Sequence, residues 1–253
     1  MNSPLVDVVI KSPNYSSRNG NTIKGITIHH TAGKLTATQI GNIFAKASRK
    51  ASCNYGVGND GKIVLCVDEQ YRSWCSSSRA NDENMITLEV SNCKGAPNWE
   101  VSDAALESTI RLVTDICRRN GIKELKFLND STKKFDYAAQ NMTLHCWFAS
   151  TSCPGPYLKG KMSYIAKRVN DNLGVSAEPS APVTPAAPTS DVPFRVRVKI
   201  PNLNIRKSPN GKVTGKYTGK GIFTIVQVSG DWGKLKSGAG WIYLANKSYC
   251  ERI

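Results

Sequence analysis

Alternating hydrophobic and polar positions indicate several short strands in the N-terminal part of the chain. The segment IKGITIHH places Ile26 and Ile28 on one face and Thr27 and His29 on the other. The segment MITLEVS alternates in the same way, and Glu89 falls on its polar face. The segment YGVGNDGKIVLCV indicates two strands joined by an Asn-Asp-Gly turn. We therefore expect a sheet whose strands each have an apolar and a polar face.

Two other segments have the period of an amphipathic helix. The segment TATQIGNIFAKASRK predicts a helix that begins near Thr36 or Thr38. The segment SDAALESTIRLVTDICRRNG predicts a longer helix, capped by Ser102 and ended by Gly121. Its buried stripe consists of Leu106, Ile110, Val113 and Cys117. Strands that alternate with helices indicate an α/β domain, in which a mixed sheet is flanked by helices.

The pattern changes after residue 174. Residues 175–192, VSAEPSAPVTPAAPTSDV, have few charged and no large aromatic side chains. This composition predicts an extended, semi-rigid linker between a domain of residues 1–174 and a smaller domain of residues 193–253. In the smaller domain, β-rich runs are separated by Pro-Asn-Gly, Gly-Lys-Gly, Ser-Gly-Asp and Ser-Gly-Ala-Gly turns. Short strands with such turns predict a small all-β barrel.

Positive charge is concentrated in the smaller domain. The 253-residue chain has a formal net charge of +15. Residues 1–174 contain 22 basic and 15 acidic residues, a net charge of +7, whereas residues 193–253 contain 12 and 2, a net charge of +10. This excess implies an anionic partner: nucleic acid, a membrane surface or an anionic polymer such as a cell wall. No known nucleic-acid-binding motif is present, so we do not expect a nucleic-acid partner.

The sequence has no feature that predicts a membrane anchor or an export signal. No apolar run approaches the roughly 20 residues of a membrane span. The N-terminal segment MNSPLVDVVIKSPNY lacks a basic region followed by an apolar stretch, which a secretory signal would have. We therefore expect the protein to fold in the cytoplasm where it is made, with its eight scattered cysteines reduced.

The segment LHCWFASTSCPGP combines residue types that bind metals or act as nucleophiles. His145 and Cys153 lie eight residues apart, and zinc prefers imidazole nitrogen and thiolate sulfur. A hydrolytic zinc site needs a third protein ligand, and the remaining histidines are His29 and His30. His29 lies opposite the apolar face of its strand, whereas His30 is the better candidate for a packed or supporting residue. The same residue types also fit a metal-free cysteine nucleophile paired with histidine.

Four segments in this order resemble a known family. ITIHHTAG, NYGVGNDGKI, MITLEV and LHCWFASTSCPG are similar in order and spacing to the zinc-dependent N-acetylmuramoyl-L-alanine amidases of the amidase-2 type. The similarity covers most of residues 20–165. In the smaller domain, LNIRKSP, GDWGKL and GWIYLANKSYC resemble a bacterial SH3-type (SH3b) wall-binding module. Together the two domains resemble a phage or prophage endolysin.

The resemblance implies a metal site and a reaction. It makes His29, His145 and Cys153 the ligands of a Zn²⁺ ion. The implied reaction is hydrolysis, by a zinc-activated water, of the amide bond between N-acetylmuramic acid and L-alanine in peptidoglycan. Two neutral imidazoles and one thiolate leave such a centre with a net charge of about +1, which favours ionisation of a bound water.

The resemblance also implies three catalytic residues. Tyr55 corresponds to the active-site tyrosine of the family, and Glu89 to a glutamate found in many members. Thr151 stands where relatives have Lys or Thr near the developing oxyanion. Glu89 or Tyr55 would move the proton between the water and the leaving amine. The chain departs from the family at Trp74-Cys75, where relatives often have Trp-His, so any polar contact of that histidine is lost or replaced.

The expected partners follow from this similarity. We expect the chain to bind bacterial peptidoglycan, with anionic wall polymers as further ligands of the basic domain, and to act on the cell wall as a monomer. Two alternatives stay open: a cysteine peptidase that hydrolyses the wall, and a non-catalytic peptidoglycan-binding protein. Relatives of the second kind typically lack the cysteine ligand, whereas Cys153 is present here.

Overall fold

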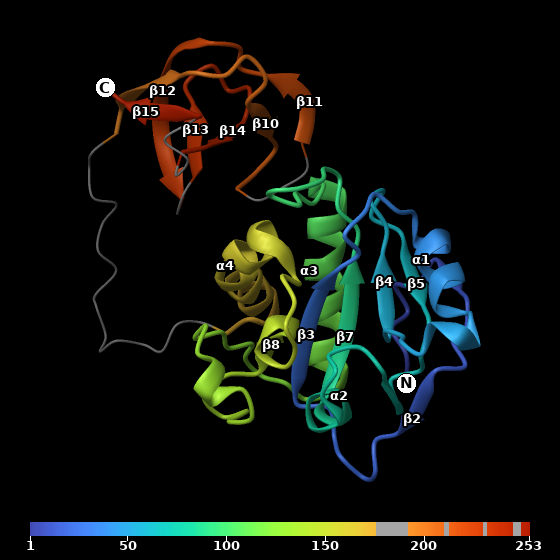
Figure 1. Ribbon diagram of the computed structural model, residues 1–253. Helices are drawn as coiled ribbons and strands as arrows, with labels where there is room; N and C mark the ends of the chain where they lie inside the picture. Colours follow the sequence, from blue (N-terminus) through green and yellow to red (C-terminus); the bar gives the residue numbers. More distant parts are fainter. Residues whose placement is uncertain (176–191, 210–212, 230–231, 245–248) are drawn as a thin grey trace. The chain divides into compact units, whose positions relative to one another are not determined.

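The chain divides into two compact units, Met1–Pro179 and Ser180–Ile253, which are described separately (Figure 1). The computed structural model describes residues 1–175, 192–209, 213–229, 232–244 and 249–253. The expected linker, residues 175–192, lies outside the described residues except at its two ends. The assignment of residues 1–174 to a catalytic domain and of residues 193–253 to a wall-binding domain stays a prediction.

A six-stranded mixed sheet forms the centre of the first unit, with the order β1-β5-β4-β7-β3-β8. Strands β4, β7, β3 and β8 run parallel to one another, whereas β5 is antiparallel to β4. The strands are β1 (Val8–Val9), β3 (Gly25–His30), β4 (Tyr55–Val57), β5 (Ile63–Leu65), β7 (Met85–Val90) and β8 (Met142–Leu144). A separate two-stranded sheet pairs β2 (Tyr15–Ser17) with β6 (Tyr71–Ser73).

Helices cover both faces of this sheet, as Figure 1 shows. The helices are α1 (Ala37–Phe44), α2 (Arg79–Asn84), α3 (Asp103–Arg119) and α4 (Gly155–Leu173), with short 3-10 turns η1 (Ala47–Arg49), η2 (Ser131–Lys133) and η3 (His145–Trp147). Helices α3 and α4 contribute to the core on one face, and α1 packs against the other face. The mixed sheet flanked by helices confirms the predicted fold class.

The helix ends follow the expected capping chemistry. The Ser102 side chain accepts a hydrogen bond from the backbone N–H of Ala105 at the start of α3. Gly121, just beyond the end of α3, has a φ of +69°, a conformation that glycine adopts without strain. Thr36 and Gln39 form a reciprocal capping box at the start of α1. Helix α1 is shorter than its sequence pattern predicts, because it ends at Phe44 and η1 follows.

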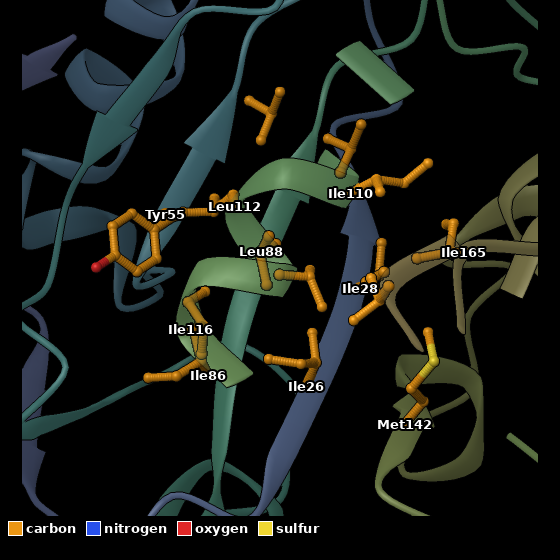
Figure 2. Close-up of a cluster of buried hydrophobic side chains, with 14 of the residues drawn as sticks. Ile26, Ile28, Tyr55, Ile86, Leu88, Ile110, Leu112, Ile116, Met142 and Ile165 are labelled. Atoms are coloured by element: carbon orange, nitrogen blue, oxygen red, sulfur yellow. The ribbon is translucent and has the colours of Figure 1, made fainter. Parts of the chain in front are cut away.

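The main core lies between the sheet and helices α3 and α4. Ile26 and Ile28 of β3 and Leu88 of β7 are completely buried in it. Ile110 of α3 and Ile165 of α4 pack on the same face, as Figure 2 shows. This arrangement agrees with the predicted apolar face of each strand.

The opposite face of β3 and β7 is polar but also buried. The hydroxyls of Thr27 and Thr143 lie 2.8 Å apart, and the side-chain amide of Asn81 donates to Thr27 at 2.9 Å. Thr143 donates to the carbonyl oxygen of Asn81 at 2.9 Å. These mutual hydrogen bonds compensate for the loss of hydration, so polar side chains can occupy a buried face. The alternation in the sequence therefore identifies which face of each strand is apolar and which is polar. It does not indicate which face is buried and which is exposed.

The second unit contains a seven-stranded sheet with the order β11-β10-β14-β13-β12-β9-β15, in which every pair of neighbours is antiparallel. The strands are β9 (Phe194–Val198), β10 (Asn204–Arg206), β11 (Val213–Tyr217), β12 (Gly221–Ser229), β13 (Trp232–Leu235), β14 (Trp241–Tyr243) and β15 (Cys250–Arg252). The unit has its own hydrophobic core. The all-β prediction is confirmed, and the likeness to an SH3 barrel stays a prediction.

Two of the predicted turns of this unit are observed between strands. Gly-Lys-Gly connects β11 to β12, and Ser-Gly-Ala-Gly connects β13 to β14. The Pro-Asn-Gly and Ser-Gly-Asp turns lie partly outside the described residues. Across the described parts of both units, no helix has the length and apolar character that crossing a membrane requires.

Candidate metal centre

Three side chains of types that can bind a metal meet where parallel strands end. His29 is the penultimate residue of β3. His145 directly follows β8, the neighbour of β3, and Cys153 lies two residues before α4. Strands β3 and β8 are parallel, so their carboxyl ends lie at the same edge of the sheet. Ligand sites commonly form at this edge in α/β folds.

The three donor groups form a compact set, which we call the first donor set. Their ligand atoms all lie within 4.8 Å of one another. Cys153 Sγ is 3.5 Å from His29 Nδ1, and the rings of His29 and His145 have centroids 4.8 Å apart. His29 is 1% exposed and Cys153 7% exposed. The structure therefore brings together the three residues for which the sequence resemblance implies metal binding.

Burial disfavours the charged form of the two imidazoles of this set. It lowers the pKa of His29 well below the usual value of 6.5, and the neighbouring His145 adds to this effect. Burial likewise lowers the pKa of His145. It raises the pKa of the Cys153 thiol, although the backbone N–H of His30 donates a hydrogen bond to this residue. Neutral imidazole and a cysteine that a metal deprotonates are the forms that zinc binds, so the donor set fits this ion.

Glu89 lies beside the first donor set. In the parallel pairing of β3 and β7, Glu89 is the partner of His29, so both side chains are on the polar face. Its carboxylate Oε1 is 3.9 Å from Cys75 Sγ, and its Oε2 is buried without a hydrogen-bond partner. Burial raises the pKa of Glu89 to about 8, and Arg49 and Cys75 only partly oppose this shift. A cation bound nearby would favour the ionised carboxylate.

Tyr55 lies on the opposite face of the sheet, which corrects its predicted role at the metal centre. In β4 Tyr55 pairs with Leu88, whereas Gly56 pairs with Glu89. The ring of Tyr55 is completely buried in the main core, where Figure 2 shows it beside Leu112. Its hydroxyl donates to Glu69 at 2.6 Å and accepts from the Ser3 N–H at 2.8 Å.

The chain departs from simple alternation just before β4, and a different residue lies on the polar side. Cys53 packs with α1, whereas Tyr55, two residues later, packs with α3. Simple alternation would place the two residues on the same face, so the sequence pattern does not indicate Cys53 as a neighbour of the site. The strand that continues β5 is irregular here too, because the N–H groups of both Cys66 and Val67 donate to the carbonyl oxygen of Asn54, at 2.9 and 3.3 Å.

Thr151 and His30 occupy supporting positions. The hydroxyl of Thr151 is in an exposed loop and accepts a hydrogen bond from the Cys153 N–H at 3.2 Å. The ring of His30 packs edge-on against Trp99, with centroids 5.5 Å apart. It lies so close to Gly155 that an added Cβ there would be 3.1 Å from its Cε1 atom. His30 thus packs beside the loop that carries Cys153, as expected for a supporting histidine.

A cavity of about 390 Å³ opens beside the first donor set. His145, Glu89 and Cys75 line one part of it. Its lining also includes Trp74 and the basic residues Arg49, Lys50, Arg72 and Arg79. These basic residues come from separate segments that only the fold brings together, so no local sequence pattern indicates them. Their charge favours an anionic ligand in the cavity.

A loop ordered by a buried carboxylate forms one wall of this cavity. Asp82 is 1% exposed and accepts hydrogen bonds from the backbone N–H groups of Cys75 and Ser76 at 3.0 and 3.1 Å. In the same loop, Ser77 Oγ lies 3.4 Å from His145 Nε2. The loop therefore contacts His145 through its Nε2 atom.

The family model described as Amidase_2, N-acetylmuramoyl-L-alanine amidase, matches residues 19–156. The chain belongs to this family. The matched segment contains all three members of the first donor set as well as Glu89 and the cavity residues named above. The protein is therefore an N-acetylmuramoyl-L-alanine amidase, a peptidoglycan hydrolase, which confirms the predicted enzyme class. This result favours the amidase over the cysteine-peptidase and non-catalytic alternatives.

Solved structures that resemble the amidase have low sequence identity to it. A selenomethionine derivative of AmpD is 17% identical, with a TM-score of 0.48, and the similarity covers 65% of this chain and 96% of that chain. The Staphylococcus aureus hydrolase AmiA, in complex with its ligand, is 18% identical, with a TM-score of 0.47 and coverages of 67% and 85%. A mutant endolysin from Bacillus subtilis is 16% identical, with a TM-score of 0.47 and coverages of 65% and 99%. Among curated proteins, no sequence matches the chain.

Proposed function

We propose that the amidase is zinc-dependent and that His29, His145 and Cys153 hold the Zn²⁺ ion. The observation that supports this proposal is the convergence of two neutral imidazoles and one thiol within 4.8 Å of one another. A bound zinc ion would polarise the scissile carbonyl and activate a water molecule for its attack. The reaction breaks the C–N bond between the lactyl carbonyl carbon of N-acetylmuramic acid and the amino group of L-alanine.

Glu89 is the group that transfers protons in this proposal. Its carboxylate takes a proton from the attacking water and delivers it to the departing nitrogen of L-alanine. Two observations support this role: Glu89 is the strand partner of His29, and its buried Oε2 has no hydrogen-bond partner among the described residues. A cation held by the first donor set would keep this carboxylate ionised despite its buried position.

Thr151 is proposed to stabilise the oxyanion that develops on the scissile carbonyl. Its exposed hydroxyl lies two residues before Cys153, in the same loop. The hydroxyl accepts a hydrogen bond from the Cys153 N–H, so its own proton is available to donate. A hydrogen bond from a neutral hydroxyl to a developing oxyanion strengthens as negative charge accumulates there.

The smaller unit is proposed to be an SH3b-like wall-binding module, and the whole chain a phage-type endolysin. Its all-antiparallel sheet and its net charge of +10 over residues 193–253 support this assignment. Trp232 and Trp241, which could contact the wall as aromatic residues, are only 8% and 9% exposed. The basic residues of this unit, rather than these two tryptophans, are the proposed feature for wall recognition, and they suit anionic wall polymers.

We expect metal analysis of the purified full chain to give one zinc per chain. Removal of the metal with a chelator should abolish wall hydrolysis, and added zinc should restore it, because the reaction needs the carbonyl polarisation and water activation that the ion supplies. An enzyme that is fully active without bound metal would contradict the proposal and would favour direct attack by a cysteine.

Binding of intact walls by residues 193–253 should be strongly salt-dependent. The Debye length falls from about 10 Å at 0.1 M salt to about 3 Å at 1 M, so attraction between exposed charges weakens as salt is added. Full-length protein and residues 1–174 should hydrolyse soluble muropeptides equally, whereas at low salt the full-length protein should lyse walls faster because it is anchored. Equal lysis by both proteins at every salt concentration would contradict anchoring.

A further inference from the structure

Cys75 and Glu89 form a second set of metal-binding groups that shares His29 with the first. The ligand atoms of His29, Cys75 and Glu89 all lie within 4.8 Å of one another. We call these three residues the second donor set. They come from β3, from the loop after β6 and from β7, so the set is assembled by the fold rather than by a local sequence motif.

Unpartnered atoms support this second set. His29 is 1% exposed, and its Nε2 is buried without a hydrogen-bond partner. The other ring nitrogen, Nδ1, is the one that lies 3.5 Å from Cys153. Glu89 Oε2 is also buried and without a partner, while Oε1 is 3.9 Å from Cys75 Sγ. Buried polar atoms without partners are costly, and a bound cation would satisfy both of these atoms.

We propose that Cys75 Sγ, the Glu89 carboxylate and His29 Nε2 bind a second divalent cation next to the catalytic one. His29 would then bridge the two cations through opposite nitrogens of its ring. The combination of thiolate, imidazole and carboxylate suits zinc and the softer cadmium ion rather than calcium or magnesium. Binding releases the thiol proton of Cys75 and the remaining ring proton of His29 to solvent.

The second cation inhibits the enzyme. A Glu89 carboxylate engaged in metal binding is not free to take a proton from water, so excess metal suppresses proton transfer. Cys75 also lines the cavity, and a cation at this position would occupy space beside the scissile bond. This consequence rests on the proposed role of Glu89 in the reaction, whereas the binding itself does not.

Cadmium titration of the full-length protein tests the second site. We expect wild-type protein to bind two cadmium ions per chain, each adding thiolate-to-cadmium charge-transfer absorption. Cys75→Ser should bind one ion and lose about half of this absorption. Glu89→Gln should also bind one ion although it retains both thiols. Cys93→Ser, which removes a partly exposed thiol outside both sets, should still bind two.

The Cys153→Ser variant shows whether the second metal site exists independently of the first one. It should keep one cadmium ion, and the remaining charge-transfer absorption should disappear when Cys75→Ser is added. One cadmium ion per wild-type chain, whatever its ligands, would overturn the second site and leave the amidase proposal intact. Two ions bound equally well by wild type and Cys75→Ser would also overturn it. In activity assays, the second equivalent of metal should inhibit the wild-type enzyme but not the Cys75→Ser variant.

Discussion

Replacing Cys153 by serine should abolish amidase activity and remove most of the bound zinc. Cys153 supplies the thiolate of the first donor set, and serine is a much weaker ligand for zinc. Loss of residues that merely support metal ligands typically lowers metal affinity or activity by about 10- to 100-fold. Loss of a ligand itself should therefore reduce activity by more than about 100-fold. His145→Ala should have the same effect. Activity on soluble muropeptides and zinc content per chain are the measurements.

Cys146→Ser is the matched control for this substitution. Cys146 is adjacent to His145 and donates its backbone N–H to the Cys153 carbonyl at 3.1 Å, but its thiol is not in either donor set. The Cys146→Ser variant should therefore retain zinc and most of its activity. Full activity in Cys153→Ser would contradict the assignment of the zinc ligands. Equal losses of zinc and activity in both variants would mean that the effect comes from disturbance of the loop between His145 and Cys153.

Glu89→Gln should lose activity while it keeps the catalytic zinc. Glutamine has nearly the same shape as glutamate but cannot accept a proton at neutral pH. Proton transfer by a positioned acid–base group typically increases the reaction rate by about 10²- to 10⁴-fold, so a decrease in kcat of this size is expected. The measurements are kcat on a soluble muropeptide and zinc content at one equivalent of added metal. Retention of wild-type kcat would exclude Glu89 as the proton-transfer group.

Tyr55→Phe is the control on the opposite face of the sheet. It removes the hydroxyl that contacts Glu69 and Ser3, so the free energy of unfolding should fall by about 1–2 kcal/mol. Zinc content and kcat should change little, because the hydroxyl lies on the α3 side of the sheet. A large decrease in kcat at unchanged stability would restore Tyr55 as a catalytic candidate.

Local sequence patterns predict much of the fold. Alternation around Ile26 and Leu88 identifies the two central strands, and the helical stripe together with the cap at Ser102 identifies α3. Helix α4 is not among the predicted elements, although its buried residues have helical spacing: Leu158, Met162, Ile165, Ala166 and Val169. The short helix α2 has no such stripe, and its residues are largely polar.

The candidate site is only partly predictable, because strand register is a tertiary property. The resemblance identifies His29, His145 and Cys153, and the structure brings them together. The resemblance assigns Tyr55 to the same site, but its pairing with Leu88 places it on the other face of the sheet. No local pattern indicates which residues line the cavity.

Analysis of the chemical ends produced from purified cell walls tests the central claim most directly. Digestion by the zinc-loaded full chain should release new amino groups of L-alanine without new reducing sugars. A chelator should stop this release, and the Cys153→Ser variant should produce none. New reducing ends appearing at the same rate as amino groups, or release that continues after all zinc has been removed, would contradict a zinc-dependent amidase.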